Sequence, residues 1–141
     1  MSISLIIFDY QMKQFSEKNF TMKIHENGLV EFLVRKGVSL TENDVWLSRD
    51  LSMNYLPGKK FYVLTEAEDE FNPTPGARTA GASKEYAKHV AAHALSSNNS
   101  FLKILGNLFI KVSRPAVKTQ FFDDRNKALA WLEKCRKENE E

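Results

Sequence analysis

The chain has 141 residues, of which 43% are hydrophobic and 27% are charged, and its formal net charge is +2. This composition is typical of one soluble globular domain, and the charge is too small for the basic face that nucleic-acid binding usually requires. The single cysteine, Cys135, cannot form an intramolecular disulfide, which favours a reducing, cytoplasmic setting. The apolar run at 5–8 lacks the features of a signal peptide and is far shorter than the ~20 residues that span a bilayer.

Alternating apolar and polar residues over 20–34 predict an antiparallel β-hairpin. A two-residue loop would split the apolar residues between the two faces of the sheet. A three-residue loop at 26–28 instead pairs Ile24 with Val30 and gathers all the apolar side chains on one face. We therefore expect the longer loop, with Gly28 supplying a positive φ.

The next segment predicts a capped helix followed by a buried strand. Thr41 is a good N-cap, and Glu42 and Asp44 place acidic side chains in the first turn, where the helix dipole favours them. Pro57-Gly58 ends this helix. The continuous apolar run at 61–64 is typical of a strand that is covered on both faces.

Residues 66–82 contain two prolines and two glycines, which argue against regular structure through most of the segment. The residues from 83 onward are ambiguous. Their alanine content favours one helix as far as 95, whereas the alternation of strands and helices along the chain favours a short helix at 83–89 and a strand at 90–95.

Residues 101–112 predict an amphipathic helix with a broad apolar stripe. Lys103 and Lys111 follow the opposite edge of this helix, and Arg114 continues that basic edge just before the proline that ends it. Gly106 lies within the helix, where we expect it to permit close packing against a neighbouring element.

The C-terminal part predicts a strand at 117–122 and a last helix that Asp123 or Asp124 caps. Cys135 falls on the apolar stripe of this helix, so we interpret it as a core thiol rather than a nucleophile. Residues 137–141 form a charged tail that we expect to fray.

The order of these elements resembles the STAS-like fold of anti-sigma-factor antagonists and, more closely, an uncharacterised family of small bacterial STAS-like proteins. The match covers about 20–136. Its last third is fairly specific, with the matching residues Leu105-Gly106-Asn107, Phe109-Ile110-Lys111, Arg114-Pro115, Lys118-Thr119, Phe122, Ala128-Leu129 and Trp131-Leu132. The resemblance implies one α/β domain with a mixed sheet, in which an antiparallel hairpin comes first and helices cross over between the later strands. It also implies a strand at 90–95, and it leaves 1–19 as an extension of unknown structure.

Anti-sigma-factor antagonists carry a phosphorylated Asp-Ser-Ser/Thr-Gly-type motif after the third strand, and this chain has no such motif there. The resemblance nevertheless implies a non-enzymatic interaction or regulatory module whose partner is another protein. The corresponding surface would include Glu66 and Lys84, and its nearest hydroxyls for phosphorylation are Thr79 and Ser83. A homodimer is a further alternative that the sequence leaves open.

A second hypothesis is the binding of a small apolar or lipid ligand under the 101–112 helix, since relatives of the STAS-like fold have been grouped with lipid-carrier domains. The residues expected to contact a ligand or an anion are Leu102, Lys103, Leu105, Phe109, Lys111 and Arg114. A cavity lined by the apolar members of this set would favour the ligand, whereas a tight core with an exposed apolar patch would favour a protein partner.

The sequence contains no recognisable catalytic, phosphate-binding or cofactor-binding motif, so we expect neither an enzyme nor a cofactor. His89 and His93 lie four residues apart and share a face of a helix or a strand. A zinc site needs further ligands, and none occurs at suitable spacing nearby. We therefore interpret both as ordinary, partly buried histidines.

Overall fold

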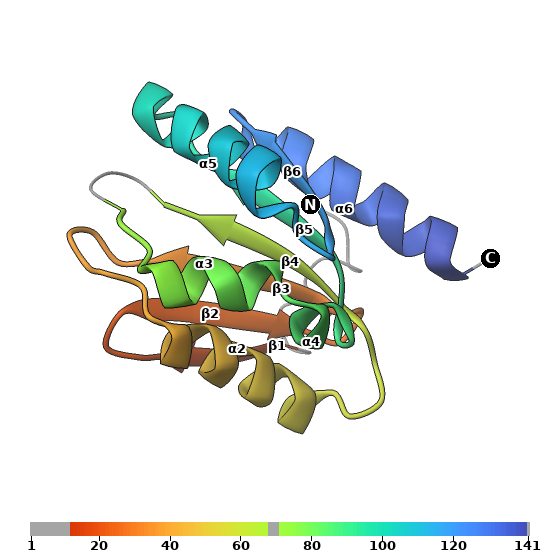
Figure 1. Cartoon of the computed structure of the whole chain (residues 1–141). Helices are drawn as coiled ribbons and strands as arrows, with labels where there is room; N and C mark the ends of the chain where they lie inside the picture. The colour runs from red at the N-terminus through yellow and green to blue at the C-terminus, as the bar shows by residue number, and fades with distance from the viewer. Residues whose placement is uncertain (1–11, 68–70, 141) are drawn as a thin grey trace.

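The structure is a computed structural model that describes residues 12–67 and 71–140. It contains a six-stranded mixed sheet with the order β1-β2-β3-β4-β5-β6 (Figure 1). The strands, in chain order, are β1 (Met12–Ser16), β2 (Phe20–His25), β3 (Leu29–Val34), β4 (Phe61–Glu66), β5 (Val90–Ser96) and β6 (Lys118–Phe122). The first three are antiparallel, and β3 to β6 are parallel to one another. The expected α/β fold with an antiparallel hairpin and a mixed sheet is confirmed.

The hairpin has the predicted register. Ile24 pairs with Val30 and Met22 pairs with Phe32, and all four side chains are buried on the same face. Gly28 ends the three-residue loop with a φ of 96°, and its N–H donates to the carbonyl of His25 over 2.9 Å. The parity of the apolar pattern was therefore sufficient to choose the loop length.

Part of the predicted N-terminal extension belongs to the sheet. Met12–Ser16 form β1, which pairs with β2 along its whole length and places Phe15 against the core. No structure was predicted for these residues from the sequence. Residues 1–11 lie outside the described part of the chain.

The helices are α2 (Glu42–Tyr55), α3 (Pro75–Ala82), α4 (Lys84–Ala87), α5 (Ser100–Ser113) and α6 (Arg125–Glu140). The cap of α2 is as predicted: the Asp44 N–H donates to the Thr41 side chain, and the Asp44 carboxylate accepts from the Thr41 N–H, which forms a capping box. Asn99 caps α5 and Asp124 caps α6. The last helix continues to Glu140, through residues that we expected to fray.

The prediction that 66–82 is mostly irregular was wrong. Thr74 accepts a hydrogen bond from the Ala77 N–H over 3.1 Å and begins α3, with Pro75 in the first turn. A proline at that position is compatible with a helix because its missing N–H would have had no intrahelical partner. Ala77 and Ala80 are buried in the core cluster, where α3 packs against α2, and this packing outweighs the low helix propensity of the two glycines.

The ambiguous segment from residue 83 is a short helix and then a strand, as the resemblance implied. β5 lies between β4 and β6 in the interior of the sheet. Its residues Ala92 and Ala94 are fully buried against α6, together with Ala128 of that helix. These alanines favour a helix locally, but in the strand their small side chains allow α6 to approach the sheet closely.

The sheet has a different cover on each face. Parallel strands added one after another through right-handed crossovers carry their helices on one face. Consistent with this, α2, α3 and α4 pack in the core cluster that contains the inward side chains of the hairpin, and α2 and α3 lie side by side (Figure 1). The other face is covered by α6, which packs on β4, β5 and β6 with Leu132 and Cys135 buried. The prediction that Cys135 is a core thiol is confirmed.

Candidate functional site

A cavity of about 380 Å³ lies on the sheet face that α2 and α3 cover, beneath α5. Its floor is formed by β3, β4 and β5, and its walls by α2 and α3. Its roof is α5, which packs against β6 and α3. The cavity exists because α5 is anchored at the β6 edge of the sheet.

The lining of this cavity is mainly apolar. Val30, Phe32 and Val63 face it from the sheet, and their buried side chains belong to the same core cluster. Leu102, Leu105 and Phe109 face it from α5, so the structure brings together the three apolar residues that the sequence analysis proposed as ligand contacts. Leu108 and Val112 also belong to the lining and are 52% and 70% exposed, which shows that the cavity reaches the surface along α5.

The basic residues proposed for the same site lie elsewhere. Lys103, Lys111 and Arg114 are exposed, and none of them lines the cavity. Arg114 ends α5 with a φ of 47°, a left-handed conformation that turns the chain toward β6. The basic edge therefore belongs to the outer surface of the roof.

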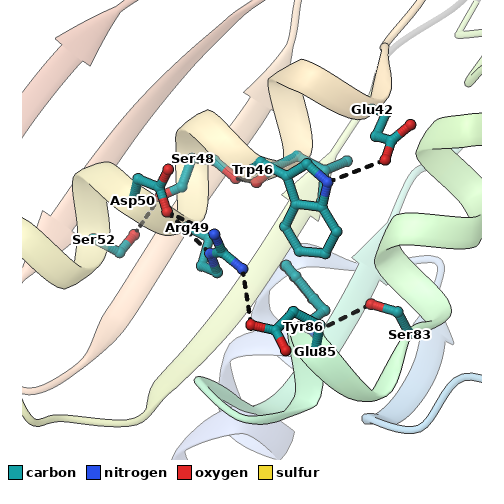
Figure 2. A network of polar contacts seen from close by, with 10 residues as sticks. Glu42, Trp46, Ser48, Arg49, Asp50, Ser52, Ser83, Glu85 and Tyr86 are labelled. Atoms are coloured by element: carbon teal, nitrogen blue, oxygen red, sulfur yellow. Dashed lines mark hydrogen bonds and ion pairs between the residues drawn. The ribbon is translucent and has the colours of Figure 1, made fainter.

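Most polar side chains of the α2 wall are already used within the protein. The hydroxyls of Ser48 and Ser52 each donate over 2.8 Å to a backbone carbonyl of their own helix. Arg49 pairs with Asp50 at 2.9 Å and with Glu85 at 3.7 Å, and its guanidinium lies 4.5 Å from the centroid of the Trp46 ring (Figure 2). These contacts connect α2 to α4 and leave the wall with little unused hydrogen-bonding capacity.

His93 is the buried polar group that differs from these. It lies in β5, is 8% exposed and lines the cavity. Its Nε2 lies 2.7 Å from Oγ1 of Thr65 on the neighbouring strand, whereas its Nδ1 is buried and has no hydrogen-bond partner. Burial lowers the pKa of His93 to about 4, so the imidazole is neutral near pH 7.

Two further polar residues, Tyr86 and Arg78, belong to the lining. Tyr86 is buried, its ring centroid lies 6.0 Å from that of His93, and burial raises the pKa of its phenol above the ordinary value. Arg78 is half-buried and donates from Nη1 to the carbonyl of Pro73 over 2.7 Å. Sequence reasoning named none of His93, Thr65 or Tyr86 as ligand contacts, because only the tertiary structure brings β4, β5 and α4 to one cavity.

Part of the apolar surface of α5 is exposed. Phe101, Ile104, Leu108 and Val112 recur at helical spacing and are between 52% and 70% exposed. We call these four residues the outer stripe. Lys103 and Lys111 lie on the same helix, and α5 contains no acidic residue. Leu108 and Val112 also line the cavity, so the outer stripe is the exposed margin of the same apolar face of α5 that forms the roof.

The residues proposed as a partner surface or as phosphorylation sites fall into two places. Glu66 ends β4 and forms an ion pair with Arg125 at the start of α6. Thr79 and Lys84 are exposed on α3 and α4, on the opposite face of the sheet. The Ser83 hydroxyl is engaged in capping α4, since it donates to the Ala80 carbonyl over 2.6 Å and accepts from the Tyr86 N–H over 3.1 Å. These four residues do not form one surface.

A chain of polar contacts crosses the sheet on the α6 side, and sequence reasoning did not find it. His25 Nε2 lies 2.6 Å from Glu31 Oε2, and Arg125 joins Glu31 to Glu66. Burial acts to raise the pKa of Glu31, but the hydrogen bonds from His25 and Arg125 outweigh it and hold that pKa to about 2. The cavity does not extend to this cluster, so we interpret it as a structural connection between α6 and the strands β2, β3 and β4.

Residues 12–67 and 71–140 contain neither a metal-binding cluster nor a membrane-spanning helix. No set of three or more His, Cys, Asp or Glu side chains in this part of the chain is arranged to hold a metal ion. None of the helices described here is long and apolar enough to cross a membrane.

The fold defines the class of protein. The structure is similar to the crystal structure of an uncharacterised protein of the DUF3478 family with a SpoIIAA-like fold, from Shewanella loihica PV-4. The TM-score is 0.51 at 15% sequence identity, and the match covers 86% of this chain and 91% of that one. The STAS-like fold expected from the sequence is thereby confirmed.

The sequence assigns the chain to a particular family. Residues 22–136 match the family described as domain of unknown function DUF7793, and the chain belongs to this family. No curated protein matches the chain. The family description names no activity, so the functional argument depends on the site itself.

Proposed function

We propose that the protein is a non-enzymatic binding module that holds a small apolar molecule in the cavity beneath α5. The observation that carries this proposal is the cavity of about 380 Å³ with Leu102, Leu105 and Phe109 in its roof. Ligand pockets typically measure ~300 to 1,000 Å³ and are lined mostly by apolar side chains. Apolar space that stays empty costs stability because the lining loses its packing contacts, so a ligand in this space would stabilise the fold.

A catalytic role for the polar pair in the cavity is the main enzymatic alternative. The Thr65 hydroxyl and the His93 imidazole are within 2.7 Å, as a nucleophile and a general base would be. A working base of this kind also needs a group that orients its second nitrogen, and a pKa near the working pH. His93 has no partner on Nδ1, and its pKa is about 4. These two properties favour binding over catalysis.

Native mass spectrometry of the freshly purified protein tests the proposal, because it reports any molecule that is retained. Ala77 is 4% exposed and lines the cavity, so Ala77→Leu places extra atoms in the space where a ligand would lie. The matched control is Ile104→Thr, since Ile104 is on α5 but does not line the cavity.

We expect retained apolar mass, or a rise in the thermal midpoint with added 1-octanol, in the wild type and in Ile104→Thr. We expect neither in Ala77→Leu. A wild-type protein that carries no ligand, and whose midpoint is unchanged by 1-octanol and by longer alcohols, would contradict the proposal.

The outer stripe supports a second candidate function, a regulatory or interaction module that binds another protein. Exposed apolar residues grouped on one helix face are typical of binding surfaces. Because the flanking Lys103, Lys111 and Arg114 are basic and α5 has no acidic residue, the best complement is an apolar groove with an acidic rim.

The double variant Phe101→Ser/Ile104→Ser removes half of the outer stripe without changing the cavity lining. We expect it to lose a partner that the wild type retains from native cell extract, and the loss to be reproduced with that partner in purified form. Sedimentation velocity on both proteins would detect a second copy of the chain as the partner. An identical set of bound proteins and an identical sedimentation coefficient would rule out this candidate.

A further inference from the structure

We infer that the molecule bound in the cavity has a neutral hydrogen-bonding group, a hydroxyl or a carbonyl, at one end of an apolar body, and that this group bonds to Nδ1 of His93. The inference rests on the proposed binding function and names the chemical class of its ligand. That class is an uncharged, medium-sized alcohol, aldehyde or ketone.

The position of His93 is the first observation that leads to this class. His93 lies at the centre of β5, paired with Val63 on one side and with Thr119 on the other. Its side chain is more than nine-tenths buried and belongs to the cavity lining. Nε2 has Thr65 as its partner, and Nδ1 has none. A buried polar atom without a partner is unfavourable and rare in folded proteins, so this nitrogen needs a partner from outside the chain.

The polar side chains of the α2 wall do not compete strongly for a ligand. Ser48 and Ser52 donate to backbone carbonyls, and Arg49 is held by two carboxylates and by the Trp46 ring. A ligand that is apolar along most of its length therefore meets one deeply buried and unsatisfied polar atom. This arrangement recognises one polar group rather than several.

The neutrality of the ring decides the charge of that group. With its pKa lowered by burial, His93 carries one N–H and one lone pair at pH 7. The Thr65 hydroxyl can donate to Nε2 or accept from it, so both tautomers are allowed. Nδ1 can accordingly accept from a ligand hydroxyl or donate to a ligand carbonyl. The neutral ring offers no positive charge to a carboxylate at the same place, and burial of an unpaired carboxylate is strongly unfavourable.

A thermodynamic cycle measures this contact directly. The probes are 1-octanol and 1-chlorooctane, which have the same chain and differ in the hydrogen-bonding end. The proteins are the wild type, His93→Phe and, as a matched control, His89→Phe, because His89 does not line the cavity. Dissociation constants come from titrations followed in 1H–15N correlation spectra, and differences in probe hydration cancel within the cycle.

We expect His93→Phe to weaken 1-octanol binding by roughly 3- to 10-fold relative to its effect on 1-chlorooctane, the range for one net hydrogen bond. We expect His89→Phe to change neither probe. A direct reading needs no variant: in protein labelled with 15N-histidine, 1-octanol should shift the Nδ1 resonance of His93. The same resonance should move little with 1-chlorooctane.

The outcomes separate this inference from the proposed function. Failure of both probes to bind wild-type protein would overturn both. Binding of both probes with no selective effect of His93→Phe, and no shift of the His93 Nδ1 resonance, would leave the binding function standing and overturn the inference. Tighter binding of octanoate than of 1-octanol, abolished by Arg78→Gln, would also overturn it, because the head group would then be an anion held by Arg78.

Discussion

Gly106 of α5 lies directly against the ring of Phe121 in β6. A Cβ atom at position 106 would stand 2.6 Å from Cδ2 and 3.1 Å from Cε2 of that ring. The helix can rest on the edge of the sheet only because residue 106 has no side chain. This contact confirms the expected role of Gly106, and it places the remainder of α5 as the roof over the cavity.

The first prediction follows from this contact. Gly106→Ala should lower the free energy of unfolding by about 1 to 2 kcal/mol, because overpacking costs more than the gain of about 1 kcal/mol in helix propensity. Gly81→Ala is the matched control, since a Cβ at that helical position has no atom within 4 Å. It should stabilise the protein by ~0.5 to 1 kcal/mol. Urea unfolding of the two variants measures both changes in the free energy of unfolding. Equal changes in the same direction would contradict the packing argument.

The second prediction concerns the hairpin loop. Gly28 has a φ of 96°, and a Cβ there would stand 3.0 Å from the carbonyl oxygen of Lys60. Gly58 has a φ of 80° with no atom within 4 Å of such a Cβ. Gly58→Ala should therefore cost about 1 kcal/mol from the backbone alone, and Gly28→Ala about 2 kcal/mol. Chemical denaturation measures both, and a Gly28 variant no less stable than the Gly58 variant would show that the Lys60 contact relaxes freely.

The third prediction is an acid dependence that arises from Glu31. Because its pKa is about 2 in the folded protein and ordinary when unfolded, the unfolded chain takes up the proton first as the pH falls. The stabilising contribution is complete above about pH 4.5 and is lost toward pH 2. Allowing for the partial exposure of Arg125, it should amount to about 1 to 2 kcal/mol.

Glu31→Gln should therefore be less stable than the wild type at pH 7, and the difference should shrink as the pH approaches 2. The exposed Glu138 provides the control substitution Glu138→Gln. Unfolding free energies at several pH values between 7 and 2 test this. A Glu31→Gln variant with the acid profile of the wild type would show that the Glu31–Arg125 contact adds nothing to stability.

The fourth prediction is that His93 makes the unfolding free energy depend on pH in a higher range than Glu31 does. Its folded pKa of about 4 lies below the unfolded value of about 6.5, so the unfolded chain binds a proton before the folded one does. The unfolding free energy should fall as the pH drops from about 6.5 to about 4, by at most about 3 kcal/mol. His93→Phe should flatten this window while it leaves the Glu31 window unchanged. An unaltered slope between pH 6.5 and 4 would show that water reaches the imidazole in the native state.

Local patterns were sufficient for several elements. The parity of the apolar residues set the pairing of Ile24 with Val30, and the capping signal at Thr41 began α2, because both depend on neighbours in the chain. The same local reasoning failed at Pro75. A proline indicates the end of a helix unless it is known to lie in the first turn. That position depends on how Ala77 and Ala80 pack in the core.

The candidate site, too, was predictable from the sequence only in part. The amphipathic pattern of 101–112 was enough to select Leu102, Leu105 and Phe109 as residues on one face of a helix, since side-chain periodicity is a local property of the backbone. The presence of space beneath that face depended on the tertiary structure, because it is the contact between Gly106 and Phe121 that anchors the roof.

The polar contacts also depended on the tertiary structure. Thr65 and His93 meet because β4 and β5 are adjacent and parallel, and Glu66 meets Arg125 across 59 residues of chain. The sequence by itself determined which faces of the elements are apolar. Only the tertiary structure decided which of those faces are filled, which enclose a cavity, and which polar atoms are left without a partner, because these depend on distances between elements that are far apart in the chain.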